Sequence, residues 1–587
     1  MEILKGKPVS PGIAIGKALL FSSKRETILK VKIDEGAIKT EIDRFNNAVK
    51  KTRAQLKKIY YNLKKVMGNE PALIIDTQYL LLKDSNLIND IKNIITSQSV
   101  KAEWAIKQIE KKYIDFFNDI PDLAFREKGN DISDVLLRVI NNLKKTGMGI
   151  AADIENVILV ADELPPSIAA NLMSSGKLLG LVLDQGGETA HTIILARTLE
   201  IPAVLDTRRA TEIAANDDLL IVDGLSGEVL IDPPKSAVAK IAIKKGKYQL
   251  YKDKLRQVID LPDKTLDAHP FTLLGNIELS FECDLVKSYG AKGLGLFRTE
   301  FLFMDQAIAL SCERQHLIYK NIARKIFPGP VVIRTYDVGR DKAYNYFKTE
   351  KEANPALGAM AVRLLLQEKK LFKSQVKAIL WANENANIKI LFPMITELEE
   401  IHTIKRIIAE AKAELIDEKR YPGHDVEMGI MIEIPGAVKL IKHLRDDIDF
   451  FSIGTNDLVQ YLLAVDRNNS SVQYLYSPYH PAVIESLIEI IRETAKIGKE
   501  VTICGEIAGQ MLTSLMLLGM GYTNFSMNPL SLIETKRIFT RVHYSYLKKI
   551  VERLTGLASR TEIEEYLIEA LLHKYPDLFV RQPAFQG

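Results

Sequence analysis

The hydrophobic pattern of this chain changes character three times along its length. Residues 1–21 combine short apolar runs with proline and glycine, which favours short strands and a turn but no helix of useful length. Between Ile38 and Val66, apolar residues recur at alternating steps of four and three, and Thr52 fills the one gap. This spacing predicts a long helix whose apolar seam packs against other helices.

The long helix is predicted to belong to a bundle that is inserted into a β/α domain. Further helical segments follow it at about 70–84, 85–96, 101–117 and 131–146. A β-rich pattern then returns at Asn156 and continues to about residue 232. The simplest explanation is a β/α domain built from residues 1–21 and 147–232, with the helical domain of residues 22–146 inserted into it.

The remainder of the chain is predicted to form a linker and a barrel. Two consecutive prolines open residues 233–260, which are interpreted as a connecting helix. In residues 261–587, helical stretches alternate with eight apolar runs: LLGNIEL, GLGLFRTEF, PVVIRTYDV, IKILFPM, EMGIMIEIP, FFSIGTND, VTICGE and NFSM. Eight strands in this arrangement predict a (β/α)8 TIM barrel. The fold class is therefore multidomain α/β.

Composition excludes several classes of protein. The chain has 587 residues, 47% hydrophobic and 26% charged, as in ordinary globular proteins. Its 79 basic and 75 acidic residues leave a formal charge of +4, which does not favour nucleic acid as a partner. No apolar run approaches the roughly 18 residues of a membrane span, and the first residues lack a signal-peptide core. We expect a cytoplasmic protein without membrane insertion.

The segment Gly-Gly-Glu-Thr-Ala-His, which ends at His191, carries the first candidate chemistry. An apolar strand-like run precedes its glycines and a helix-period segment follows, so His191 is predicted to stand at a helix N-terminus. Unpaired N–H groups and the helix dipole favour a phosphate there, and imidazole is a nucleophile that can carry a phosphoryl group. A capping or surface histidine after a Gly-Gly turn is the alternative interpretation.

Polar and charged side chains follow the apolar strands of the predicted barrel. They are Arg298, Arg334, Glu433, Asn456 with Asp457, and Cys504. Catalytic groups of such barrels lie where the strands end, although buried structural ion pairs would give the same pattern. Arginines suit phosphate and carboxylate, and Arg467 supplies a third. Two carboxylates suit Mg²⁺, which completes its shell with water and substrate oxygens. A thiol at a strand end is a candidate proton donor.

At these residues the chain resembles a known family. The chain is similar to Enzyme I of the bacterial phosphotransferase system, the phosphoenolpyruvate-protein phosphotransferases, in the strings VSPGIAIGKALL, GGETAHTIILARTLEIPAVL, GLGLFRTEFLFM, RTYDVGRDK, FPMITELEE, MIEIPGA, DFFSIGTNDLVQYLLAVDR and ICGEIAGQ. The match runs in order through essentially the whole chain, and the helical insert stands where that family has its carrier-binding domain. Several strings in register make a chance match unlikely.

The resemblance implies a role for each candidate residue. His191 would take the phosphoryl group of phosphoenolpyruvate and pass it to a histidine of the carrier protein HPr. Substrate would be bound by Arg298, Arg334, Asn456 and Arg467. Glu433 and Asp457 would bind Mg²⁺, and Cys504 would protonate the enolate carbon as pyruvate forms. Members of the family are homodimers that associate through the barrel, which corresponds to residues 261–587 of this chain.

This chain departs from the family pattern at four positions. Glu188 stands where a basic residue usually precedes the histidine, Met360 replaces an arginine, Arg340 a glycine and Gln510 an aspartate. The helical insert is also basic, with 21 basic and 16 acidic residues between positions 31 and 146, whereas a typical HPr is basic around its histidine. A degenerate regulatory protein that binds phosphoenolpyruvate or a carrier with little turnover is therefore the alternative. A dikinase would need a large nucleotide-binding domain, for which we see no region.

Overall fold

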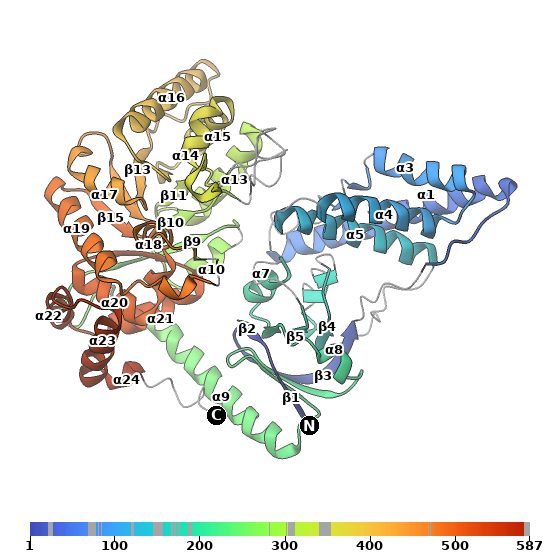
Figure 1. Ribbon diagram of the computed structural model, residues 1–587, viewed down its shortest axis with the longest axis horizontal. Helices are drawn as coiled ribbons and strands as arrows, with labels where there is room; N and C mark the ends of the chain where they lie inside the picture. The colour runs from blue at the N-terminus through green and yellow to red at the C-terminus, as the bar shows by residue number, and fades with distance from the viewer. Residues whose placement is uncertain are drawn as a thin grey trace. The chain divides into compact units, whose positions relative to one another are not determined.

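The computed structural model places most of the chain, which divides into two compact units between Leu250 and Tyr251. The described residues are 1–21, 28–67, 78–79, 81–83, 85–118, 123–144, 156–165, 168–169, 172–173, 176–185, 191–280, 282–300, 302, 311–339, 354–467, 469 and 471–579. Figure 1 labels the helices and strands. None of the helices in these ranges has both the length and the apolar character that a bilayer span requires.

A mixed eight-stranded sheet forms one layer of the first unit, in the order β1-β8-β7-β3-β4-β5-β6-β2. Its strands are β1 (Glu2–Lys5), β2 (Lys7–Ser10), β3 (Ile13–Phe21), β4 (Val157–Ala161), β5 (Leu178–Leu183), β6 (Ala203–Leu205), β7 (Leu219–Asp223) and β8 (Glu228–Ile231). The four central strands β3, β4, β5 and β6 are parallel neighbours. The strands that flank the helical insert in the sequence, β3 and β4, therefore pair directly with each other.

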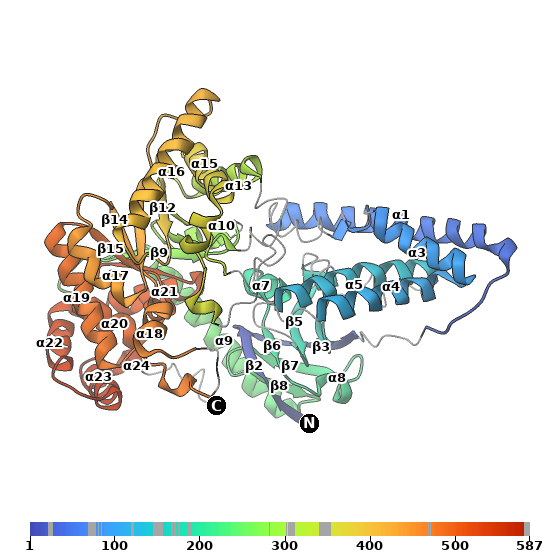
Figure 2. The ribbon, with the colours of Figure 1, turned by 45° about the horizontal axis from the view of Figure 1, so that its top comes forward.

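The inserted helices are α1 (Ile38–Met67), α3 (Ser85–Gln98), α4 (Ala102–Asn118) and α5 (Leu123–Lys144). They lie side by side in both Figure 1 and Figure 2. The seam of α1 is buried as its spacing predicts, at Phe45, Val49, Thr52, Leu56 and Ile59. The segment predicted at 70–84 lies mostly outside the described residues. Helix α5 begins eight residues before the predicted start, because a helix can accommodate one glycine at a cost of about 1 kcal/mol.

The linker helix α9 (Lys235–Val258) packs on the first unit through its N-terminal half. Its Ala237, Val238 and Ile241 cover a small core formed by sheet residues. Lys244 of α9 also pairs with the buried carboxylate of Asp223 at the end of β7, at 2.7 Å. This half of the linker is therefore fixed to the sheet by both apolar and charged contacts.

The second unit is a closed barrel of parallel strands in the order β9 to β16. The strands are β9 (Thr272–Ile277), β10 (Leu294–Phe297), β11 (Val331–Arg334), β12 (Ile388–Phe392), β13 (Glu427–Ile432), β14 (Phe450–Ile453), β15 (Glu500–Ile503) and β16 (Asn524–Met527). Each one coincides with a predicted strand, although β9 and β15 begin one residue earlier than predicted. Short apolar runs between helices suit a sheet that is buried on both faces. The predicted fold class is confirmed.

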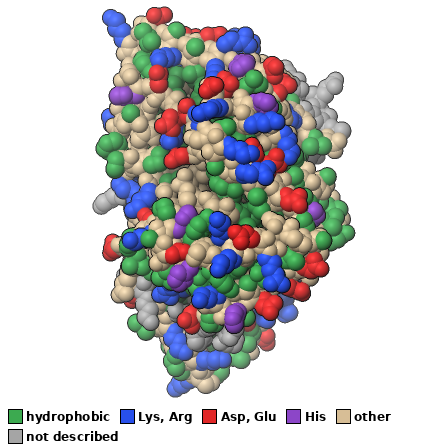
Figure 3. Space-filling model, turned by 90° about the vertical axis from the view of Figure 1, so that its left-hand side faces the viewer, with side chains coloured by type: hydrophobic (Ala, Val, Ile, Leu, Met, Phe, Trp, Pro, Cys, Tyr) green, Lys and Arg blue, Asp and Glu red, His purple; other side chains and the backbone are tan. Residues whose placement is uncertain are grey.

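Helices surround this barrel, as Figure 2 shows for α13, α15, α16 and α19. The longer ones are α13 (Cys312–Ile326), α15 (Lys369–Ala382), α16 (Leu398–Asp417), α18 (Thr455–Leu463), α19 (Pro481–Ile497), α20 (Met511–Met520), α21 (Pro529–Phe539), α22 (Tyr544–Leu554) and α23 (Arg560–Lys574). On the face drawn in Figure 3, acidic and basic side chains are interspersed.

Candidate active site

His191 is the first residue of helix α7 (His191–Thr198), which follows β5. The helix is held on the sheet by three buried side chains, Ile193, Leu195 and Ala196. The Nε of Arg197 also donates to the carbonyl of Val9 at 2.6 Å. The predicted position of His191 at a helix N-terminus is therefore confirmed. Residues 186–190 lie outside the described ranges.

The end of β5 is anchored by Asp184, whose carboxylate is buried. It accepts hydrogen bonds from the backbone N–H groups of Ala210 and Thr211, and from the hydroxyls of Thr207 and Thr211, at 2.5–2.9 Å. These bonds outweigh burial and lower the pKa of Asp184. They tie the loop after β6 to the strand from which the chain continues toward His191.

The barrel brings the other predicted site residues together at the carboxyl ends of its strands. Arg298 follows β10, Arg334 ends β11, Glu433 follows β13 and Cys504 follows β15. Asn456 and Asp457 lie one step further along, in the first turn of α18 after β14. Because all the strands are parallel, these ends share one mouth of the barrel.

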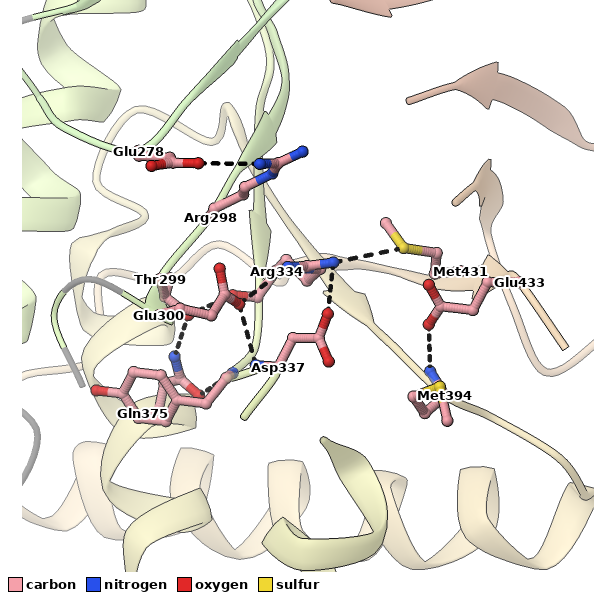
Figure 4. A network of polar contacts seen from close by, with 11 residues as sticks. Glu278, Arg298, Thr299, Glu300, Arg334, Asp337, Gln375, Met394, Met431 and Glu433 are labelled. Atoms are coloured by element: carbon pink, nitrogen blue, oxygen red, sulfur yellow. Dashed lines mark hydrogen bonds and ion pairs between the residues drawn. The ribbon is translucent and has the colours of Figure 1, made fainter. Parts of the chain in front are cut away.

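Arg334 is held in place by two carboxylates. Its guanidinium pairs with Asp337 at 2.8 Å and with Glu300 at 3.1 Å (Figure 4). Burial by itself would lower the pKa of Arg334, but these two charges raise it. The Nε of Arg334 is buried and has no partner among the described residues. Arg334 is therefore fixed as a cation with one donor free for a further ligand.

A buried network of hydrogen bonds holds the backbone around Arg334. The hydroxyl of Thr299 donates to the backbone carbonyl of Arg334 at 2.8 Å and accepts from Gln375 of α15 at 3.2 Å. The carbonyl oxygen of Gln375 accepts from the backbone N–H of Tyr336 at 3.1 Å (Figure 4). This network fixes the backbone at Arg334 and at Tyr336, two residues further along.

The other arginines and Asn456 are more accessible. Arg298 pairs with Glu278, which follows β9, at 2.9 Å, and both side chains are partly exposed. Buried nitrogens without a partner among the described residues occur in Arg298 (Nε) and Arg467 (Nη1). Asn456 donates to Glu506 at 3.1 Å, so its amide is already oriented. Three arginines thus present unsatisfied donors, which suit an anionic ligand.

Glu433 and Asp457 form an acidic pair with excess negative charge. The Oε1 of Glu433 accepts from the backbone N–H of Met394 at 2.7 Å, while its Oε2 is buried without a partner in the described residues. Burial, together with the charges of Asp337 and Asp457, raises the pKa of Glu433 well above its usual value. Burial also raises the pKa of Asp457, against the attraction of Arg467.

These carboxylates fit a divalent cation held by few protein oxygens. The unpartnered oxygen of Glu433 and the raised pKa values are what a missing positive charge would produce. Within the described ranges, no three His, Cys, Asp or Glu side chains are grouped closely enough to form a cage. Most of the coordination shell would therefore come from water and substrate, as Mg²⁺ prefers.

Cys504 is buried in the apolar layer inside the barrel, beside Leu296, Val332 and Met431. Its Sγ lies 3.6 Å from the carbonyl of Gly295. Burial raises the pKa of Cys504 to about 11, although the hydroxyls of Ser452 and Ser526 oppose the shift. The thiol is therefore protonated at neutral pH, as a proton donor must be.

Two acidic residues of the site were missed from the sequence. Glu300 and Asp337 stand two and three residues beyond Arg298 and Arg334, inside strings that were already recognised. Their position two and three residues after the arginines was the signal in the sequence that could have identified them as part of the site. The pairing of Glu300 with Arg334 depends on the packing of β10 against β11, which short-range spacing does not specify, whereas Asp337 lies three residues after Arg334 in the same segment.

Three segments of the chain match families of one group of enzymes. They are described as the PEP-utilising enzyme N-terminal domain (residues 5–128), mobile domain (153–227) and PEP-binding domain (252–544). The phosphoenolpyruvate-protein phosphotransferase of Haemophilus influenzae is 36% identical over 571 residues, which is 97% of this chain and 99% of that protein. This chain belongs to the phosphoenolpyruvate-protein phosphotransferase family. The family resemblance read from the sequence is thereby confirmed.

A second curated relative has the same name. The Bacillus subtilis protein of the same name is 35% identical over 97% of this chain and 100% of its own length. A solution structure described as Enzyme I is 35% identical over 42% of this chain and 99% of that chain, with a TM-score of 0.37.

Two of the four departures from the family pattern can be placed. Met360 forms a backbone bridge with Gly339, and its sulfur lies 3.8 Å from the hydroxyl of Tyr461. Gln510 is exposed at the start of α20, and its side chain does not cap the helix. Glu188 and Arg340 lie outside the described residues. Met360 thus places an uncharged group near Tyr461, where the family normally has an arginine.

Proposed function

We propose that this chain transfers the phosphoryl group of phosphoenolpyruvate through His191 to a histidine of the carrier protein HPr and releases pyruvate. One observation supports this proposal most strongly. Arginine donors without a partner, a carboxylate oxygen without a partner and a protonated thiol lie at the same mouth of the barrel. These groups match the phosphate, the carboxylate and the methylene carbon of one small substrate. The relatives named above carry the name of this activity.

The arginines would bind and orient the substrate. Arg298, Arg334 and Arg467 neutralise the phosphate and carboxylate, and Asn456 adds a polar contact. Transfer of a phosphoryl group needs mainly an in-line nucleophile and charge neutralisation, so fixed cations supply much of the catalysis. Arg334 suits this task because Glu300 and Asp337 hold its guanidinium in one position.

The reaction has two steps, and each forms one bond and breaks another. A ring nitrogen of His191 attacks phosphorus, and the bond between phosphorus and the enol oxygen breaks, which leaves the enolate of pyruvate. Cys504 then gives its proton to the methylene carbon, which completes pyruvate, and the thiolate takes a proton from solvent. Glu433 and Asp457 would hold Mg²⁺, which when bound supplies positive charge to the phosphate oxygens.

Further parts of the proposal concern domains, partners and location. The phosphohistidine domain would comprise residues 1–21 and 147–232, the HPr-binding domain residues 22–146, the linker residues 233–260 and the barrel residues 261–587. Association as a homodimer through the barrel and a cytoplasmic location belong to the same proposal. They are supported by the family to which the chain belongs.

The test is phosphorylation with phosphoenolpyruvate labelled in its phosphate. Purified protein with Mg²⁺ should acquire acid-labile, base-stable label, and His191→Ala should acquire none. Added HPr should then remove the label from the wild type. Folded wild-type protein that stays unlabelled would instead support the regulatory alternative, for which the comparisons give no support.

A further inference from the structure

Glu506 lies at the mouth of the barrel, yet the proposed reaction gives it no task. It stands two residues after Cys504, as the first residue of the short 3-10 helix η5 (Glu506–Gly509), and its side chain is exposed. A carboxylate repels the phosphate and the carboxylate of an anionic substrate, because like charges repel. Any contribution of Glu506 to substrate binding is therefore made through a neighbouring side chain or a cation.

The neighbouring side chain is Asn456, which Glu506 contacts through two hydrogen bonds. The Nδ2 of Asn456 donates to the Oε1 of Glu506 at 3.1 Å, and the backbone N–H of Glu506 donates to the Oδ1 of Asn456 at 3.4 Å. An ionised carboxylate can only accept a hydrogen bond, and a backbone N–H can only donate one. A half-turn of the amide would set oxygen against oxygen and hydrogen against hydrogen. Glu506 therefore fixes which end of the Asn456 amide is the donor.

The backbone of Asn456 is held as well. The hydroxyl of Tyr476 donates to the carbonyl oxygen of Asn456 at 3.2 Å. Burial raises the pKa of Tyr476 to about 12, although the positive charge of Arg467 opposes the shift. Tyr476 therefore remains a hydroxyl donor at neutral pH. Asn456 is thus fixed at its side chain and at its main chain.

The end of β15 packs directly against the start of α18. The backbone N–H of Cys504 donates to the carbonyl of Ile453, the last residue of β14, at 3.0 Å. A Cβ atom at Gly505 would overlap the hydroxyl of Thr455 and lie only 2.8 Å from its Cβ. Glycine at position 505 is therefore what permits this close approach. The segments that carry Cys504 and Asn456 are held together as one unit.

One hydrogen of the Asn456 amide remains for a ligand. The Nδ2 carries two hydrogens, and in the described part of the chain only the one that points to Glu506 has an acceptor. The amide oxygen already accepts from the backbone of Glu506. The group that Asn456 presents is therefore an N–H donor, which suits an anionic ligand.

We propose that Glu506 is a positioning residue, which orients the amide of Asn456 so that its free N–H faces the phosphate or the carboxylate of the substrate. This inference rests on the proposed function, in which Asn456 contacts phosphoenolpyruvate. Without the carboxylate of Glu506, the amide would be free to turn and present its oxygen, which repels the same anion. The contribution of Glu506 thus depends entirely on Asn456.

Direct binding of Mg²⁺ is the alternative task for a carboxylate at this place. One oxygen of Glu506 is already engaged by Asn456. Among the described residues, Glu506 belongs to no group of three His, Cys, Asp or Glu side chains that could hold a metal ion. The contacts favour orientation of Asn456, and the Mg²⁺ requirement of a Glu506 variant distinguishes the two tasks.

The test is a double-mutant cycle in the full-length His191→Ala protein, which binds phosphoenolpyruvate without consuming it. Glu506→Ala, Asn456→Ala and the double variant are compared, with Glu506→Gln as the conservative variant. Glu552→Ala, which changes an exposed glutamate of α22, is the matched control. Dissociation constants for phosphoenolpyruvate are measured by isothermal titration calorimetry at saturating Mg²⁺, and thermal melting checks that each variant is folded.

Glu506→Ala should weaken the binding of phosphoenolpyruvate by about tenfold, the size expected for the loss of one hydrogen bond to a charged group. Glu506→Gln keeps an acceptor oxygen, so its affinity should stay within about threefold of the parent protein. In the Asn456→Ala protein, Glu506→Ala should change the affinity by less than about twofold, because no amide remains to be oriented. Glu552→Ala should bind as the parent protein does.

Three results would overturn the inference. Weakening by Glu506→Ala that persists in the Asn456→Ala protein would show that Glu506 acts independently of the amide. Tighter binding by Glu506→Gln would show that the negative charge of Glu506, and not its hydrogen bond, determines the affinity. A higher Mg²⁺ concentration for half-maximal binding in Glu506→Ala would assign Glu506 to the metal.

Labelling of the wild type by phosphoenolpyruvate tests the proposed function separately. Wild-type protein that is labelled at His191, with no coupling between Glu506 and Asn456 in binding, would refute this inference alone. Coupling in binding without any label on the wild type would refute the proposed transfer alone.

Discussion

Cys504 offers the sharpest test of the chemistry, since its pKa predicts how the thiol reacts. With a pKa of about 11, roughly one thiol in a thousand is ionised at pH 8. An ordinary cysteine with a pKa of about 8.5 is about one quarter ionised at the same pH. Because the thiolate is the reactive form, we expect alkylation of Cys504 to be about 200-fold slower than that of a free thiol.

The assay follows alkylation by iodoacetamide, with Cys504 quantified by peptide mass spectrometry and glutathione as the reference thiol. The rate at Cys504 should still be rising with pH above pH 10. Burial against Gly295 and the apolar barrel layer should slow it further. A midpoint near pH 8.5 would refute the reasoning, because it would mean that the site does not favour the neutral thiol.

Replacement of the thiol tests its role directly. Cys504→Ser keeps the size but removes an acid that can donate at neutral pH, so pyruvate formation should slow by about 10²- to 10⁴-fold. Pyruvate is measured with lactate dehydrogenase, and circular dichroism serves as the folding control. Wild-type rates in this variant would return Cys504 to a purely structural role in the barrel core.

Three further predictions follow from the charged groups. Arg298→Ala should abolish labelling with little loss of stability, because the side chain of Arg298 is partly exposed. Arg334→Ala should abolish labelling and also destabilise the barrel by about 3–5 kcal/mol, because it leaves Glu300 and Asp337 unpaired. The free energy of unfolding, measured with urea, distinguishes the two variants. Asp184→Ala should cost about 3 kcal/mol at pH 7. Since the folded pKa of Asp184 is lowered, the part of this difference that comes from ionisation is fully present above about pH 4 and is lost as the pH falls through the folded pKa. A pH-independent difference would contradict this cause. Glu433→Gln should raise the Mg²⁺ concentration for half-maximal labelling by at least about tenfold. Without Mg²⁺, the Glu433→Gln variant should have a higher melting temperature than the wild type at pH 8. The raised pKa of Glu433 means that its ionised form destabilises the folded state, and the neutral amide removes that cost. A lower melting temperature would contradict repulsion of Glu433 by Asp337 and Asp457.

The arginines show where interpretation of the sequence was incomplete. From the sequence, Arg298 and Arg334 look equivalent, because each follows an apolar strand. The structure separates them: Arg334 is buried between two carboxylates, and Arg298 is partly exposed with one. Mutation of Arg334 therefore cannot be expected to leave folding intact, so Arg298 is the cleaner test of substrate binding.

The strands, the barrel and the set of polar residues at the strand ends could all be predicted from the sequence. Those features depend on local periodicity, because a buried parallel strand must be apolar and the residue after it is free to be polar. The helix that begins at His191 was predictable for the same reason, from the glycines and the apolar period around it.

How the charges of the site interact could be learned only from the folded arrangement of the strands. The pairing of Arg334 with Glu300, the unsatisfied oxygen of Glu433 and the raised pKa of Cys504 all depend on which strand ends lie side by side and how deeply they are buried. Burial removes water from these groups, so each charge is set by its neighbours across the barrel. Sequence spacing carries no information about those distances.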